Sequence, residues 1–241
     1  MTLVPRFRLA LINPNTDEAD TAEMVVAATA ALGDGAEVLA LTARRGVAGI
    51  ETSAESLIAA AETLALVRET PGADAYLIAC FGDPGLDGAR EVTDAPVVGI
   101  GEATYRAMAS VSRRFAVITT LRRGIPELLD GMERYGVASR CVGVLASEIT
   151  VEDLGGDSTD AIVSLGRRAV DELGAEALAL ACGGMTELET AVRDRVGVPA
   201  TNGVAFGALL AHALWRAGLR TSTVGSLASP PGLAAAPADA C

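Results

Sequence analysis

The chain has 241 residues, of which 50% are hydrophobic, with a net charge of −12 at pH 7 and an isoelectric point near 4.5. This length and apolar content suffice for one large domain or two small ones, each with a sizeable core. Such an acidic chain is not expected to bind nucleic acid, because binding to the phosphate backbone depends on clustered Lys and Arg. No apolar run approaches the ~20 residues that span a membrane, so no membrane partner is expected either.

The two ends of the chain and its cysteines predict a cytoplasmic location. The first residues run directly into a predicted strand and lack the charged, apolar and small-residue layout of a signal peptide. The cysteines at positions 80, 141, 182 and 241 are too few and too scattered for a disulfide scaffold, which favours a reducing compartment. Residues 226–241 are rich in proline and alanine without periodicity, and we expect a disordered tail that includes Cys241.

Short apolar runs alternate along the chain with longer segments of helical periodicity. In the first half, strands are predicted at residues 9–12, 37–41, 75–79 and 96–100, with helices from about 17, at 51–68, after Pro84 and at 102–112. In the second half, strands are predicted at residues 115–119, 141–145, 176–181 and 198–201, with helices near 124–135, 159–173, 186–195 and 205–217. Strands that alternate with helices specify parallel sheets covered on both faces, with ligand sites at the carboxyl ends of the strands.

The second half of the chain repeats landmarks of the first. Cys80 and Cys182 each follow an apolar run and precede glycines, and they are 102 residues apart. Residues 8–13 and 96–101 correspond, at nearly the same spacing, to 114–119 and 199–203. The sequence therefore predicts an α/β fold of two pseudo-symmetric Rossmann-like lobes, each with a four-stranded, mainly parallel sheet flanked by helices. We expect the first lobe to comprise residues 1–104 and about 205–225, and the second lobe residues 105–204.

The turn after Cys80 is predicted to start a helix, with Asp83 as the N-cap and Pro84 in the first helical position. The positive end of that helix would lower the thiol pKa from its usual value of about 8.5. A single cysteine at a strand end is ordinarily a small buried hydrophobe. A duplicated one is more informative, because two lobes packed about a pseudo-twofold axis would place Cys80 and Cys182 on opposite sides of one cleft.

Four segments carry a family resemblance: residues 11–16 (LINPNT), 79–91 (ACFGDPGLDGARE), 96–103 (PVVGIGEA) and 117–121 (VITTL). They resemble the hydantoin/allantoin racemase family of the aspartate/glutamate racemase superfamily. The similarity extends from about residue 8 to residue 218. The resemblance implies an active site between two lobes, a small-molecule substrate, no cofactor and a homo-oligomer. No metal is expected, because the single histidine, His212, argues against a zinc site. The resemblance also implies that Cys80 and Cys182 are the catalytic acid and base. Further contacts to the substrate are implied for Asn15, Phe81, Gly82, Thr119, Thr120, Gly183 and Gly184.

Two facing thiols suit the inversion of a stereocentre. A proton must leave one face of the carbon and return to the other, which two groups can do if one is a thiolate and the other a thiol. C5 of a hydantoin is activated by the neighbouring carbonyl, and N–H groups beside the cysteines would stabilise the developing enolate oxygen. We therefore expect a cofactor-independent racemase of 5-substituted hydantoins or allantoin.

Other functions stay open at this point. A racemase of aspartate or glutamate would need cations for the α-carboxylate, and Arg122 and Arg123 could supply them. A decarboxylase or a cis–trans isomerase of the same superfamily could use two cysteines, and a small-molecule binding protein could use the same lobes without turnover. Cys141 is expected to pack in the core, whereas the roles of Glu148 and Asn202 are left open.

Overall fold

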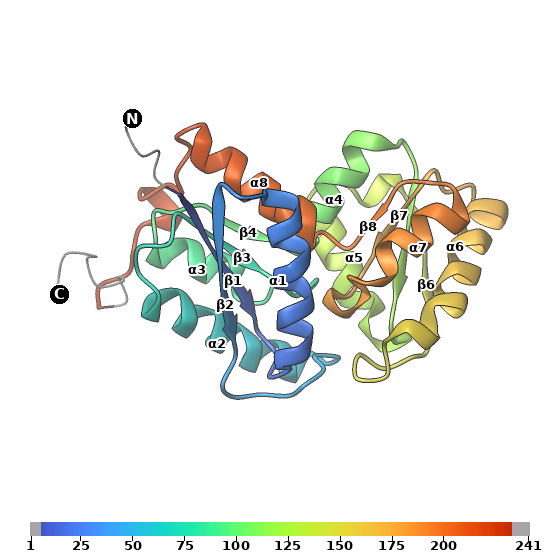
Figure 1. Ribbon diagram of the computed structural model, residues 1–241, viewed down its shortest axis with the longest axis horizontal. Coiled ribbons are helices and arrows are strands. Elements are labelled where there is room, and N and C mark those ends of the chain that lie inside the picture. Colours follow the sequence, from blue (N-terminus) through green and yellow to red (C-terminus); the bar gives the residue numbers. More distant parts are fainter. Residues whose placement is uncertain (1–5, 233–241) are drawn as a thin grey trace.

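Two four-stranded sheets lie side by side in the computed structural model, which describes residues 6–232 (Figure 1). The first sheet has the order β2-β1-β3-β4 and comprises β1 (Phe7–Asn13), β2 (Ala36–Thr42), β3 (Ala75–Ile78) and β4 (Val97–Gly99). The second has the order β6-β5-β7-β8 and comprises β5 (Phe115–Thr119), β6 (Cys141–Ala146), β7 (Ala177–Leu180) and β8 (Ala200–Thr201). All strand pairs are parallel. The predicted α/β class and the two equivalent lobes are confirmed.

Helices cover both sheets and connect successive strands. They are α1 (Glu18–Leu32), α2 (Ser53–Glu69), α3 (Leu86–Val92), α4 (Ile100–Val111), α5 (Ile125–Arg134), α6 (Thr159–Leu173), α7 (Leu188–Val196) and α8 (Val204–Arg216). Local capping explains where two of them start. The Asp17 carboxylate accepts the N–H groups of Ala19 and Asp20 at the start of α1, and Thr52 with Glu55 forms a capping box at the start of α2.

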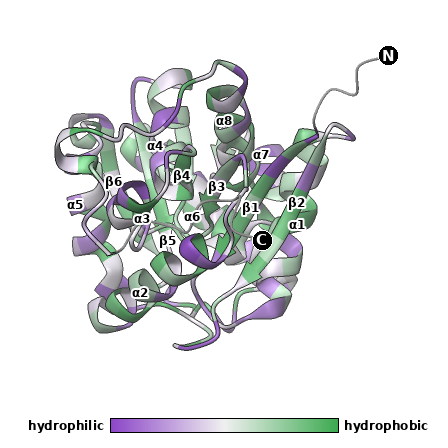
Figure 2. Cartoon of the chain, turned by 90° about the vertical axis from the view of Figure 1, so that its left-hand side faces the viewer, coloured by the Kyte–Doolittle hydropathy of each residue, from purple (hydrophilic) through white to green (hydrophobic). Residues whose placement is uncertain are grey.

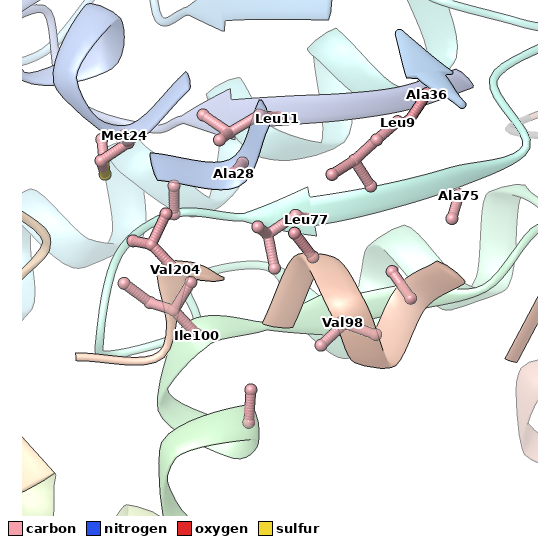
Figure 3. Packing of buried hydrophobic residues seen from close by; sticks show 14 of the residues in the cluster. Leu9, Leu11, Met24, Ala28, Ala36, Ala75, Leu77, Val98, Ile100 and Val204 are labelled. Atoms are coloured by element: carbon pink, nitrogen blue, oxygen red, sulfur yellow. The ribbon is translucent and has the colours of Figure 1, made fainter. Parts of the chain in front are cut away.

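Alternation of apolar residues places one core on each side of the first sheet. On one side, Leu9 and Leu11 of β1 and Leu77 of β3 pack against Met24 of α1 and Val204 of α8 (Figure 3). Hydrophobic residues follow the central strands, while hydrophilic residues gather on the outer helices and loops (Figure 2). The helix α8 follows the second sheet in the chain yet packs on β3 and α1, so that the chain returns to the first lobe.

The predicted helix start after Cys80 is wrong. Helix α3 begins at Leu86, and its N-cap is Gly85, which has a left-handed φ of 79°. Asp83 does not cap this helix; its carboxylate accepts the backbone N–H groups of Gly101 and Glu102 at the start of α4. The reason is conformational, because Asp83 itself has a positive φ of 50°, which turns its side chain away from α3.

The predicted C-terminal tail and the predicted lobe boundaries can be compared with the structure only in part. The predicted tail begins within a short 3-10 turn, Gly225–Leu227, that packs against α3. Positions 233–241, including Cys241, lie outside the described residues. The predicted lobe boundary after residue 104 falls inside α4, and the division into two domains stays a prediction. Among the helices of residues 6–232, none has the length and apolar character needed to cross a membrane.

The first core gives a direct test of stability. Leu77 is fully buried, and we expect Leu77→Ala to lower the free energy of unfolding by about 2–5 kcal/mol, because the substitution leaves a cavity in a close-packed core. Leu57→Ala is the matched control, since Leu57 is 74% exposed on α2, and its effect should stay within about 0.5 kcal/mol. Urea unfolding followed by circular dichroism measures both. Equal effects of the two substitutions would contradict this arrangement of the core.

Candidate active site

A cavity of about 90 Å³ lies between the two lobes, at the carboxyl ends of the central strands. The strands β1 and β3 of the first lobe and β5 and β7 of the second end at its wall. All nine residues predicted from the sequence for the site line this one cavity: Asn15, Cys80, Phe81, Gly82, Thr119, Thr120, Cys182, Gly183 and Gly184. The pseudo-symmetry of the lobes therefore brings segments from both halves of the chain to one place.

The two cysteine turns have equivalent geometry. Cys80 follows β3 and Cys182 follows β7, and neither is in a disulfide. Each thiol faces a backbone N–H two residues further along, that of Gly82 for Cys80 and that of Gly184 for Cys182. Each turn is closed on the main chain as well, since the carbonyl of Cys80 accepts the N–H of Asp83 at 3.0 Å. In the second lobe, the carbonyl of Cys182 accepts the N–H of Met185 at 3.2 Å.

Burial controls the acidity of both thiols. It raises the pKa of Cys80 to about 12 and that of Cys182 to about 12, and the N–H groups of Gly82 and Gly184 offset only part of the rise. The predicted lowering of the Cys80 pKa is therefore wrong. The helix that was expected to lower it starts only at Leu86, so its positive end does not reach the thiol.

Three carboxylates on the cavity wall were not expected from the sequence. They are Asp20 of α1, Glu51 of the loop before α2, and Glu127 of α5. The carboxylate of Glu127 raises the pKa of Cys80 further, and those of Asp20 and Glu51 raise that of Cys182, all after the larger effect of burial. Burial also raises the pKa of Asp20. These residues carry no local sequence signal, because each lies on a different element and faces the cavity only in the folded chain.

Two of these carboxylates, those of Glu51 and Glu127, also connect the lobes. The Oε1 atom of Glu51 accepts the backbone N–H of Val151 at 2.8 Å, across the two lobes. The hydroxyl of Ser56 in α2 donates to Oε1 of Glu127 in α5 at 3.2 Å. Unpredicted apolar side chains complete the wall: Met24, Ile50, Leu121, Leu128 and Val151.

No cation among residues 6–232 lines the cavity. Arg122, a candidate for binding an α-carboxylate, is exposed and pairs instead with Glu148, with 3.3 Å between the Nε and Oε1 atoms. Neither Arg123 nor Glu148 belongs to the wall. In the same part of the chain, no group of three or more His, Cys, Asp or Glu side chains has a spacing that could hold a metal ion.

Asn202, whose role the sequence left open, and Cys141, which was predicted to pack in the core, both lie apart from the cavity wall. Asn202 is fully buried and donates through Nδ2 to the carbonyls of Cys182 and Gly183 and to the hydroxyl of Thr186, at 3.4, 3.2 and 2.8 Å. Cys141 lies half-buried in β6, packed against the core of the second lobe. Cys141 therefore takes the packing position that was predicted for it.

Comparison with known proteins places this geometry in a family. A family profile described as Asp/Glu/Hydantoin racemase matches residues 9–211. The chain belongs to this family. A hydantoin racemase of Rhizobium meliloti is 39% identical over 236 residues, which cover 96% of this chain and 98% of that protein. A hydantoin racemase of Pseudomonas sp. (strain NS671) is 36% identical over 220 residues, which cover 89% and 88%.

A solved structure leads to the same racemase family. The allantoin racemase from Klebsiella pneumoniae superposes on this chain with a TM-score of 0.90 at 35% identity, covering 93% of this chain and 94% of that one. The predicted resemblance is confirmed. The chain is an enzyme, an isomerase of the racemase type.

The raised thiol pKa values predict how alkylation depends on pH. Only the thiolate reacts, so the rate at Cys80 and at Cys182 should rise about tenfold for each pH unit between 7 and 9, without a plateau. Iodoacetamide labelling followed by mass spectrometry of the peptides measures each rate separately. A rate that levels off near pH 7 would show that the thiols are acidic after all.

Proposed function

We propose that the enzyme inverts C5 of 5-substituted hydantoins, without a cofactor, and that Cys80 and Cys182 are its two bases. The observation that supports this most strongly is the pair of equivalent cysteine turns on the wall of one small cavity. The sides of the cavity come from opposite lobes, so the two thiols would approach a bound ring from opposite faces.

In the proposed mechanism, one cysteine enters as a thiolate and takes the C5 proton, while the other donates its proton to the opposite face. The electron pair of the C5–H bond moves into the neighbouring carbonyl and then back to C5, so the net charge of the pair is unchanged. A thiolate of a weakly acidic thiol is a stronger base, and burial thus helps the abstraction once the charge is present. Thr119 and Thr120, which line the cavity, carry hydroxyl donors for the developing enolate oxygen.

The charge on the cavity wall favours a neutral substrate. Three carboxylates, and no Lys or Arg from residues 6–232, line the wall. A hydantoin ring is neutral and offers N–H donors to such acceptors, whereas the α-carboxylate of aspartate or glutamate would be repelled. Allantoin is also a hydantoin, with a ureido group that adds further N–H donors. The similar proteins described above include both a hydantoin racemase and an allantoin racemase.

Cysteine substitution tests the two-base mechanism. We expect Cys80→Ala and Cys182→Ala each to lower the racemisation rate by at least about 10³-fold, because each removes a proton carrier from one face. The change is followed by circular dichroism with L- and D-5-benzylhydantoin and with both enantiomers of allantoin in deuterated water. Deuterium at C5 is counted by mass spectrometry.

The controls separate the alternatives. Cys141→Ala, a cysteine outside the cavity wall, should keep the wild-type rate. Racemisation that survives in either cavity variant would reject the two-base mechanism. If aspartate or glutamate were inverted and no hydantoin were, the amino-acid racemase would replace our proposal.

The homo-oligomeric state and the cytoplasmic location stay predictions from the sequence. Apolar side chains on the outer surface of the chain, such as Val26 and Val224, are 69% and 75% exposed. Light scattering after size-exclusion chromatography measures the assembly directly.

A further inference from the structure

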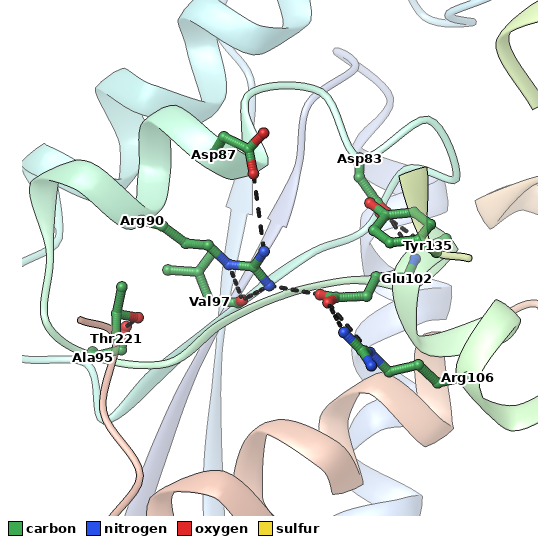
Figure 4. Close-up of polar contacts among 10 residues, drawn as sticks. Asp83, Asp87, Arg90, Ala95, Val97, Glu102, Arg106, Tyr135 and Thr221 are labelled. Carbon is green, nitrogen blue, oxygen red and sulfur yellow. Dashed lines mark hydrogen bonds and ion pairs between the residues drawn. The ribbon is translucent and has the colours of Figure 1, made fainter. Parts of the chain in front are cut away.

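Asp83 is a buried carboxylate that the proposed mechanism does not use. It is 3% exposed and lies three residues after Cys80. Its Oδ1 accepts the N–H of Gly101 at 2.9 Å, and its Oδ2 accepts the N–H of Glu102 at 2.7 Å and the hydroxyl of Tyr135 at 2.6 Å (Figure 4). Three donors thus converge on one side chain, two from the start of α4 and one from the end of α5.

The fit between this turn and α4 is close. A Cβ atom on Gly99 would overlap the carboxyl of Asp83, and a Cβ on Gly101 would overlap the carbonyl oxygen of Phe81. Asp83 is also one of the few non-glycine residues with a positive φ, 50°, a strained conformation that persists only where surrounding contacts hold it. The carboxylate and the N-terminus of α4 supply these contacts.

A second connection joins α4 to α3, the helix that follows the turn. Glu102 is buried, and its carboxylate pairs with Arg90 of α3 at 2.6 Å and with Arg106 of α4 at 2.7 Å (Figure 4). Since α3 follows the Cys80 turn in the chain, two successive contacts, one through Asp83 and one through Arg90, attach this segment to α4.

The second lobe makes an equivalent connection from the opposite side. Asn202, which precedes α8, donates to the carbonyls of Cys182 and Gly183 and to the hydroxyl of Thr186 in the cysteine turn. In the first lobe the turn contributes the side chain and the helix start contributes main-chain donors. In the second lobe the segment before the helix contributes the side chain and the turn contributes the acceptors. Gly99 occupies the position that corresponds to Asn202 in the repeat, which leaves room for the Asp83 carboxylate.

We propose that Asp83 and Asn202 are positioning residues, each of which fixes the cysteine turn of its own lobe so that the N–H of Gly82 or Gly184 points at the thiolate. This inference rests on the proposed function in one respect, the role of the two thiols as bases. Neither Asp83 nor Asn202 lines the cavity, so both act on the reaction through the turns.

The test measures the alkylation rate of each thiol separately, together with racemisation of 5-benzylhydantoin. In Asp83→Asn, one acceptor oxygen becomes a donor, and we expect the Cys80 rate to fall about fivefold or more while the Cys182 rate stays within about twofold. In Asn202→Ala the pattern is reversed, with a fall at Cys182 alone. The turnover number kcat should fall about tenfold in each variant with little change in KM, because the thiolate and not the substrate contact is affected.

Asp87→Asn is the matched control for Asp83→Asn. Asp87 is exposed on α3, four residues away, and pairs with Arg90 only at 4.0 Å. The same substitution there should leave both thiol rates and kcat unchanged, because Arg90 keeps its 2.6 Å pair with Glu102. The direction at Cys80 is itself decisive, because loss of the Asp83 charge alone would make the thiolate more stable. A faster reaction of Cys80 in Asp83→Asn would therefore overturn the positioning role.

Poor folding of Asp83→Asn would show as faster alkylation of both thiols together. In that case Tyr135→Phe tests the proposal, because it keeps the Asp83 carboxylate and removes one of its donors. We expect a smaller fall at Cys80, about twofold to threefold, with Cys182 unchanged; an unchanged Cys80 rate would overturn the proposal. Alkylation requires no turnover, so failure of the proposed substrate leaves the thiol pattern readable. Loss of the thiol pattern with intact racemisation would instead reject only the positioning roles.

Discussion

The site depends on one geometric constraint, which is that parallel strands of a sheet all end at the same edge. In the first lobe this edge carries Asn15 and Cys80, and in the second it carries Thr119 and Cys182. These two sheet edges face each other across the contact between the lobes. Four segments from distant parts of the chain therefore surround one cavity. The cores beneath the strands, built from residues such as Leu77, hold the edges in place.

Within the cavity, the cost of burying charge decides the chemistry. Burial holds the thiols of Cys80 and Cys182 in the neutral form, and nearby carboxylates add to the effect. The Gly82 and Gly184 N–H groups oppose it only in part. A site of this kind is suited to one negative charge that moves between two thiols, and it is poorly suited to an anionic substrate.

Pseudo-symmetry of the fold does not require identical side chains. Both lobes connect the cysteine turn to the segment that starts the next helix, yet Asp83 makes the connection from the turn and Asn202 makes it from the segment before α8. The Asp83 carboxyl, whose pKa burial raises to about 7, accepts the donors that the N-terminus of α4 provides. The Asn202 amide instead donates to the carbonyls that the turn after Cys182 provides. The two lobes thus make the same kind of connection with opposite hydrogen-bond polarity.

Much of the fold could be predicted from the sequence, because periodicity, capping and the repeat are local or nearly local signals. Strand β5 and helix α6 have their predicted limits, and the repeated cysteines by themselves predict one shared cavity. Tertiary structure alone decided the rest. Asp83 was predicted to cap the helix that follows it, but its positive φ directs the carboxylate to α4. The carboxylates of Asp20 and Glu127 reach the cavity from separate lobes, and the direction of the thiol pKa shift depends on burial, which no short stretch of sequence determines.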